Sequence, residues 1–196
     1  MSSRWSPRTE KPIRTLRWQR LSRPARSSRP PTMSESAVIS PCGAYRYVLT
    51  RTSEVVHPDR GTALFLMLNP STADATQDDP TIRRCRGFAR SWGCAGLTVA
   101  NLFALRATDP SALQRHTAPI GPDNDAWLRR LAAEHMDVVC AWGALPFAAA
   151  RASDVALILR AAGARLWCLG TTKHGAPRHP LYVRGDQTLV PWEVSQ

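Results

Sequence analysis

The chain has 196 residues, which is enough for one well-buried core and gives no reason to expect two. Its formal net charge of +11 ordinarily points to a nucleic-acid partner. Residues 1–32 carry +8 of that charge, which leaves only +3 for the remainder. A domain of that charge can bind an anionic ligand through a local patch, but its composition does not require DNA.

The N-terminal segment, residues 1–36, is rich in Arg, Pro and Ser and has almost nothing apolar to bury, so we expect it to be disordered. It has no apolar stretch typical of a secretion signal, and its prolines interrupt an amphipathic transit helix. Met33 follows the basic stretch, and we expect translation to begin there; the alternative is a basic nucleic-acid tail. Residues 37–196 are predicted to form a single α/β domain.

Five cysteines are present without any C-x-x-C pair, a spacing that argues against a zinc ribbon or a cysteine-ligated iron–sulfur cluster. We therefore expect reduced thiols in a cytoplasmic protein, with no bound cofactor or metal. No apolar stretch approaches the roughly 20 residues of a membrane helix, so no membrane association is expected.

Short apolar runs alternate with helical patterns along the rest of the chain. Tyr45 to Thr50 alternate as in an antiparallel edge strand, which we expect to pair with the strand that follows. Continuous apolar runs are typical of strands buried on both faces of a parallel sheet. Such runs lie at 62–68, 97–103, 138–142 and 165–169, and a final short strand is expected at 188–192. Helical patterns lie between them, at 80–92, 121–135 and 146–162.

This alternation predicts a three-layer α/β domain with a central, mainly parallel four-stranded sheet, flanked by helices and extended by an N-terminal edge strand or hairpin. In open α/β sheets, ligands bind outside the carboxyl ends of the strands. Four loops are expected to meet there, at 69–79, 101–109, 142–146 and 170–182.

The loop that follows the first core strand is the main candidate site. A short polar side chain such as Asn69 at a strand end can hold a water or a ligand edge, and Pro70 fixes the backbone behind it. The alternative is that Asn69 only caps the turn, with Ser71 and Thr72 bonding local amides.

An acidic group follows in the same loop. Asp74, Asp78 and Asp79 have the carboxylates that can hold a hydrated Mg²⁺ or act as a general base. The alternative for Asp79 is to cap the helix that begins at Pro80.

Polar side chains also follow the later strands. The amide of Asn101 has a donor and an acceptor in one plane, which complements the edge of a pyrimidine or purine; alternatively it satisfies loop backbone groups. Phe103 can stack on a base or belong to the core. The segment 173–182 concentrates His, Lys, Arg and Tyr, which can donate to a carbonyl, a leaving group or a phosphate.

Together these motifs resemble a bacterial family, the domain of unknown function numbered 1643. The resemblance extends from about Tyr45 to Trp192. It rests on the segments 68–74, 79–85, 101–104, 121–125, 142–143 and 175–182.

A more distant resemblance is to the uracil-DNA glycosylase superfamily, which has Asn-Pro, Asn, Trp-Gly and His-Pro motifs after successive parallel strands. Asn69-Pro70, Asn101, Trp142-Gly143 and His179-Pro180 occur in the same order. This resemblance implies that a base is extruded into the pocket, that Asn101 reads its edge, that Asn69 positions the attacking water, and that His179 stabilises charge on the departing base.

The resulting hypothesis is a pocket that recognises a nucleobase or nucleotide in nucleic acid, with N-glycosidic hydrolysis as the reaction if the protein is an enzyme. A binding module without catalysis and a metal-assisted phosphoryl hydrolase using Asp74, Asp78 and Asp79 are the alternatives. The catalytic candidates are Asn69, His179 and Asp74. The candidates for substrate binding are Pro70, Ser71, Thr72, Asn101, Phe103, Trp142, Gly143, Lys173, Arg178 and Tyr182.

Overall fold

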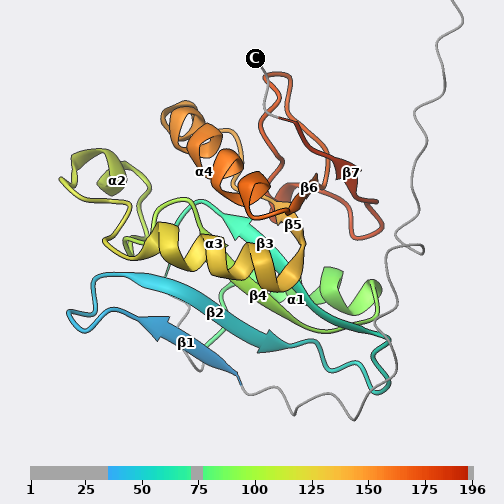
Figure 1. The fold of residues 1–196 in the computed structure, drawn as a ribbon. Helices are drawn as coiled ribbons and strands as arrows, with labels where there is room; N and C mark the ends of the chain where they lie inside the picture. Colours follow the sequence, from blue (N-terminus) through green and yellow to red (C-terminus); the bar gives the residue numbers. More distant parts are fainter. Residues whose placement is uncertain (1–34, 72–76, 194–196) are drawn as a thin grey trace, which may run out of the picture.

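The computed structural model describes residues 35–71 and 77–193 (Figure 1). The strands are β1 (Ser36–Ile39), β2 (Arg46–Thr52), β3 (Arg60–Met67), β4 (Cys94–Asn101), β5 (Asp137–Cys140), β6 (Arg165–Cys168) and β7 (Val190–Pro191). The helices are α1 (Pro80–Ser91), α2 (Ser111–Arg115), α3 (Asn124–His135) and α4 (Ala149–Ala161). Short 3-10 turns lie at η2 (Pro146–Ala148) and η3 (Pro180–Tyr182).

These elements build a mixed sheet of seven strands in the order β1-β2-β4-β3-β5-β6-β7. The pairs β4–β3, β3–β5 and β5–β6 are parallel, whereas β1, β2 and β7 run antiparallel to their neighbours. The fold is therefore mixed α/β, as the alternation of apolar runs and helical patterns predicts.

The sheet is mixed: the hairpin β1–β2 extends it on one side and the short strand β7, which lies within the segment 188–192 expected to form a final strand, extends it on the other. The expected partner of β2 was wrong. β2 pairs with β1 and with β4, not with the next strand along the chain, and β1 covers it so that it is not an edge strand. Sequence patterns identify strands but carry no information about non-local pairing.

Helices cover both faces of the sheet (Figure 1). One face packs on α1 through Ile82, Cys85 and Phe88. The other face packs on α3 and α4, with Leu128 and Val155 in the same core. Alternate residues of the central strands divide between these two cores, which is why their sequences read as unbroken apolar runs.

Helix α1 begins where its sequence predicts. The side chain of Asp79 accepts a hydrogen bond from the backbone N–H of Ile82 at 2.8 Å, and Pro80 occupies the first helical position. This start brings the first turn of α1 to the loop that follows β3, so the helix contributes Asp79 and Thr81 to the cavity described below.

No helix among residues 35–71 and 77–193 is both long and apolar enough to span a membrane.

A substitution at Gly96 tests how closely strand β4 packs between β2 and β3. It lies opposite Thr52 on one side and Thr62 on the other, and a Cβ there would overlap the backbone carbonyl of Arg51. We expect Gly96→Ala to lower the free energy of unfolding by about 2 kcal/mol in urea titrations. Gly87→Ala is the control: it lies on exposed helix surface with open space around it and should stabilise by about 0.5 to 1 kcal/mol. Equal stabilities of the two variants would contradict this packing.

Candidate functional site

A cavity of about 760 Å³ lies at the carboxyl ends of the parallel strands, and we call it the strand-end cavity. Its size is typical of pockets for small-molecule ligands. Its wall includes Asn69 after β3, Asn101 at the end of β4, Trp142 after β5 and His179 in the loop after β6. Arg46 of β2 completes this row, which follows the order of the strands across the sheet.

Hydrogen bonds from α3 and α4 fix the backbone at Asn101. The side-chain amide of Asn124 donates to the carbonyl oxygens of Asn101 and Leu102 at 3.0 and 3.1 Å, and Arg151 Nε donates to the Leu102 oxygen at 3.0 Å. Arg151 in turn pairs with Asp125. These bonds fix the backbone at the end of β4 and hence the direction of the Asn101 side chain.

The Asn101 side chain itself is only 1% exposed and lines the strand-end cavity. Its amide nitrogen has no hydrogen-bond partner among the residues that the structure describes. A buried donor without an acceptor costs about 1 to 3 kcal/mol, and native proteins rarely retain one without a reason. The donor is therefore available to a ligand in the cavity.

Asn69 is oriented by the neighbouring loop. Its Nδ2 donates to the carbonyl oxygens of Pro70 at 2.9 Å and Ala107 at 2.7 Å, and the backbone N–H of Ala107 returns a hydrogen bond to Pro70. Because the amide nitrogen is used in this way, the group that Asn69 offers to a ligand or water is its acceptor oxygen. An acceptor is the group that can orient an attacking water.

The loop after β6 carries His179 to the cavity. A small turn, closed by the bridge between Thr171 and Pro177, precedes it. The backbone N–H of Leu181 donates to His179 Nδ1 at 3.4 Å, so the ring proton of a neutral His179 lies on Nε2. Burial lowers the pKa of His179, and the nearby Asp79 only partly opposes this effect. At neutral pH the ring is thus an uncharged donor.

Helix α1 anchors this loop from the other side. Arg84 donates from Nε to the carbonyl of Pro180 at 3.3 Å and from Nη2 to that of Val183 at 2.5 Å. The short segment that carries His179 is therefore fixed at its C-terminal end by a helix residue that lies outside the cavity.

The pair Trp142-Gly143 forms the wall between Asn69 and His179. The Trp142 ring is buried and meets the ring of Trp192 edge-on, with 4.9 Å between centroids. Gly143 has φ of 85°, and a Cβ at that position would lie 3.4 Å from the Cβ of His179. Its N–H also donates to Pro177 at 3.0 Å. Glycine is favoured here by its backbone conformation, which side chains rarely adopt, while the space beside His179 would hold a Cβ in ordinary contact.

Eight of the residues predicted for the site line the strand-end cavity. They are Asn69, Ser71, Asn101, Trp142, Gly143, Arg178, His179 and Tyr182. Tyr182 lies at its mouth, with 80% of its surface exposed.

The other predicted residues are placed elsewhere or lie outside the described part of the chain. Phe103 belongs to the core and contacts the ring of Phe147 at 6.1 Å, and Pro70 is buried beside the cavity. Lys173 lies on the exposed turn after β6 and is not part of the wall. Thr72 and Asp74 fall within residues 72–76, which the structure does not describe.

Sequence reasoning missed the contribution of Arg46 and of the hydroxyls of Thr81, Thr108 and Thr172, all of which line the cavity. The threonines carry no distinctive signal in one sequence. Arg46 carries a weak one, since it is a charged residue directly before the apolar run Tyr47–Leu49 of β2.

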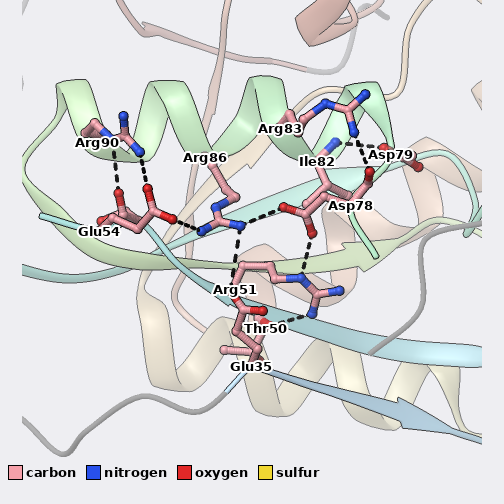
Figure 2. Close-up of polar contacts among 11 residues, drawn as sticks. Glu35, Thr50, Arg51, Glu54, Asp78, Asp79, Ile82, Arg83, Arg86 and Arg90 are labelled. Carbon is pink, nitrogen blue, oxygen red and sulfur yellow. Dashed lines mark hydrogen bonds and ion pairs between the residues drawn. The ribbon is translucent and has the colours of Figure 1, made fainter. Parts of the chain in front are cut away.

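Asp78 and Asp79 do not form a paired carboxylate site. Figure 2 shows the carboxylate of Asp78 between two guanidinium groups, with Arg51 Nε at 2.7 Å and Arg86 Nη1 at 2.8 Å. Arg86 also pairs with Glu54 at 2.8 Å, while Asp79 caps α1. Among the described residues there is no group of three or more His, Cys, Asp or Glu side chains arranged to hold a metal ion.

This network fixes the end of the loop that leads into α1. Arg51 is 0% exposed and lies on β2, so its pairing with Asp78 ties the loop to the sheet beside the cavity wall. Burial raises the pKa of Asp78, but hydrogen bonds from Arg86 and Arg51 and the charges of both groups outweigh it, so that the pKa lies below its usual 3.8.

The cysteines are all free, and four of them are buried. Burial raises the pKa of Cys94 to about 11 and also raises that of Cys140, so these thiols stay protonated at neutral pH. The cavity wall contains none of the five.

The chain is thus an α/β protein with a ligand-sized cavity where its parallel strands end. Residues 46–181, more than half of the chain, match the model of the family described as protein of unknown function DUF1643, and the chain belongs to that family. The comparisons with curated proteins and with solved structures gave no match.

The ion pairs of Asp78 give a prediction about acid stability. Asp78→Asn removes the carboxylate from a buried arginine, and we expect it to lower the free energy of unfolding by about 3 kcal/mol at neutral pH. Because the folded pKa of Asp78 is lowered, its contribution is present above pH 3.8 and is lost as the pH falls through the folded value. The difference between wild type and variant should therefore shrink below pH 3.8 in urea titrations at a series of pH values.

Glu134→Gln is the matched control, since it removes an exposed ion pair with Arg130. It should change the stability by less than about 1 kcal/mol. A pH-independent difference between wild type and Asp78→Asn would show that the charge of Asp78 is not what stabilises the loop.

Proposed function

We propose that the strand-end cavity recognises a nucleobase, and that the protein hydrolyses the N-glycosidic bond that joins this base to its sugar. The observation that carries the proposal is the amide nitrogen of Asn101, which is buried in the cavity wall without an acceptor. A base edge supplies such an acceptor in the plane of a rigid ring, and side-chain amides are common readers of base edges.

The cavity also has a surface suited to a flat ring. Trp142, Leu145 and Val99 provide apolar wall, and the polar groups gather at the strand ends. Binding pockets for small ligands commonly combine an apolar lining with a few fixed polar groups.

The proposed chemistry uses two groups that line the same cavity, Asn69 and His179. The oxygen of Asn69 accepts a hydrogen bond from a water and aligns it for attack on the sugar carbon. His179 donates from Nε2 to the base as the bond to the sugar breaks and negative charge develops on the ring. The order of Asn-Pro, Asn, Trp-Gly and His-Pro at successive strand ends, which resembles the uracil-DNA glycosylase superfamily, supports these assignments.

A panel of oligonucleotides tests this proposal. Strands with uracil, hypoxanthine, oxidised bases or mismatches are incubated with the full chain and then treated with alkali, which cleaves at abasic sites. We expect cleavage for at least one base, reduced about 100-fold in Asn69→Ala and His179→Ala. Asn101→Ala should weaken binding of the same strand about 10-fold.

Glu134→Gln, far from the cavity on α3, serves as the control and should cleave as wild type does; circular dichroism checks that each variant is folded. Salt-dependent binding without product would support a binding module and remove the hydrolytic part of the proposal. Absence of both binding and cleavage across the panel would overturn it entirely.

The lowered pKa of His179 predicts the acid side of the pH profile. Protonation would place a hydrogen on Nδ1, the atom that accepts from the Leu181 N–H, and would break the contact that orients the ring. Hydrolysis should therefore persist at pH 6.5, the ordinary pKa of histidine, and decline as the pH falls further through the lowered pKa of His179. His179→Gln keeps a donor but cannot titrate. Its rate should be low and show no decline between pH 6.5 and 5, measured on the best substrate of the panel; an unchanged acid decline in this variant would exclude His179 as its source.

A further inference from the structure

The reaction proposed for the strand-end cavity needs a group that takes a proton from the attacking water. The water oxygen bonds to the sugar carbon, the electron pair of the broken C–N bond passes to the nucleobase, and the water releases a proton. Positive charge also develops on the sugar as the nucleobase departs. A carboxylate meets both needs, because it accepts a proton and its charge stabilises a cation.

The residues already assigned to the chemistry do not take this proton. The Asn69 amide orients a water but is not a proton acceptor at neutral pH. His179 Nδ1 accepts from the Leu181 N–H at 3.4 Å, so its Nε2 carries the ring proton and acts as a donor. Apart from one carboxylate, the other polar groups in the described part of the wall are amides, alcohols, a phenol and guanidinium groups, which do not accept protons at neutral pH.

Asp79 is the single carboxylate among the described residues that line the cavity. It is half-buried and lies at the end of the loop that begins with Asn69 after β3. Its charge acts on the ring of His179, whose pKa it raises against the larger effect of burial. Asp79 and His179 are therefore near each other in the wall.

The cap of helix α1 uses only one oxygen of the Asp79 carboxylate. Oδ1 accepts from the backbone N–H of Ile82 at 2.8 Å, whereas Oδ2 has no hydrogen-bond or ion-pair partner among residues 35–71 and 77–193. Figure 2 shows this cap apart from the ion pairs that hold the neighbouring Asp78. Asp79 therefore keeps a negative charge and a free acceptor oxygen, whereas two arginines neutralise Asp78.

The backbone on both sides of Asp79 is fixed. Asp78 is bound to the buried Arg51 of β2 at 2.7 Å and to Arg86 of α1 at 2.8 Å. The carbonyl oxygen of Asp79 accepts from the backbone N–H of Arg83 at 3.1 Å. A carboxylate held in this way loses little freedom when it meets a substrate, which favours a role in catalysis.

We propose that Asp79 is the catalytic carboxylate of the strand-end cavity. This inference rests on the proposed function and adds the group that accepts the proton. Asn69 aligns the water, Asp79 Oδ2 receives its proton as the C–O bond forms, and the charge of Asp79 stabilises the positive charge on the sugar. The C–N bond breaks with its electron pair on the nucleobase, beside His179. The proton on Asp79 then passes to solvent and the nucleobase takes one up, which balances the exchange.

Asp79→Asn separates catalysis from helix capping. Asparagine caps helices about as well as aspartate, so this variant should unfold at nearly the same urea concentration as wild type. It removes the charge and the proton acceptor. We expect single-turnover cleavage of the most rapidly cleaved oligonucleotide of the panel, measured with the full chain, to be about 100- to 1,000-fold slower, with Kd changed less than about threefold.

Asp79→Ser tests the carboxylate itself. Serine also caps helices, and its smaller side chain leaves room for a small carboxylate in the cavity. Sodium formate should raise the cleavage rate of this variant at least about 10-fold, and sodium chloride at the same ionic strength should not. A purely structural role of Asp79 would give no such rescue.

Asp109→Asn is the matched control. Asp109 also accepts a hydrogen bond within a turn, from the backbone N–H of Ser111 at 2.9 Å, but it is exposed and is not part of the wall. Its neighbours Thr108 and Pro110 line the cavity. This variant should cleave as wild type does.

The outcomes separate this inference from the proposed function. Cleavage that persists at the wild-type rate in Asp79→Asn, or a loss that formate does not restore in Asp79→Ser, would overturn the role of Asp79 and leave base recognition and hydrolysis intact. Absence of cleavage by wild type across the panel would overturn both.

Discussion

Parallel pairing of β3 with β4 on one side and with β5 on the other is the constraint on which the site depends. Parallel strands end at the same edge of a sheet, so the loops that follow them meet there, whatever their separation in the chain. Asn69 and Asn101 are 32 positions apart in the sequence and His179 lies far beyond both, yet all three line one cavity. Backbone pairing of the parallel strands, and not contact between these side chains, is what places them at one edge of the sheet.

Polar anchors behind the wall then hold each loop. Asn124 fixes the end of β4, Arg84 fixes the loop that carries His179, and Arg51 with Arg86 fixes Asp78 at the start of α1. Three of these four anchors are arginines. Buried or half-buried guanidinium groups that bind carbonyls and carboxylates are structural here.

The polar groups of the cavity wall differ from these anchors in their hydrogen bonding. The donor groups of these anchors bind protein oxygens, whereas the donor nitrogen of the Asn101 amide in the wall is buried without an acceptor among the described residues. Asn69 presents an acceptor, and neutral His179 presents a donor. A ligand with a planar ring and hydrogen-bonding groups along its edge meets these requirements, which is the basis of the proposed function.

The sequence by itself determined the α/β class, the approximate bounds of most strands and helices, the cap of α1 by Asp79, and eight of the residues in the cavity wall, because strand periodicity and turn chemistry are local. Tertiary structure alone decided the pairing of β2 with β4, the order of the strands in the sheet, the position of Phe103 in the core, and the ion pairs of Asp78 with two arginines. Tertiary structure also decided on which face of the sheet the Arg46 side chain lies. Simple alternation places Arg46 with Val48, and only a bulge in β2, which depends on the register between β1 and β2, turns it into the cavity.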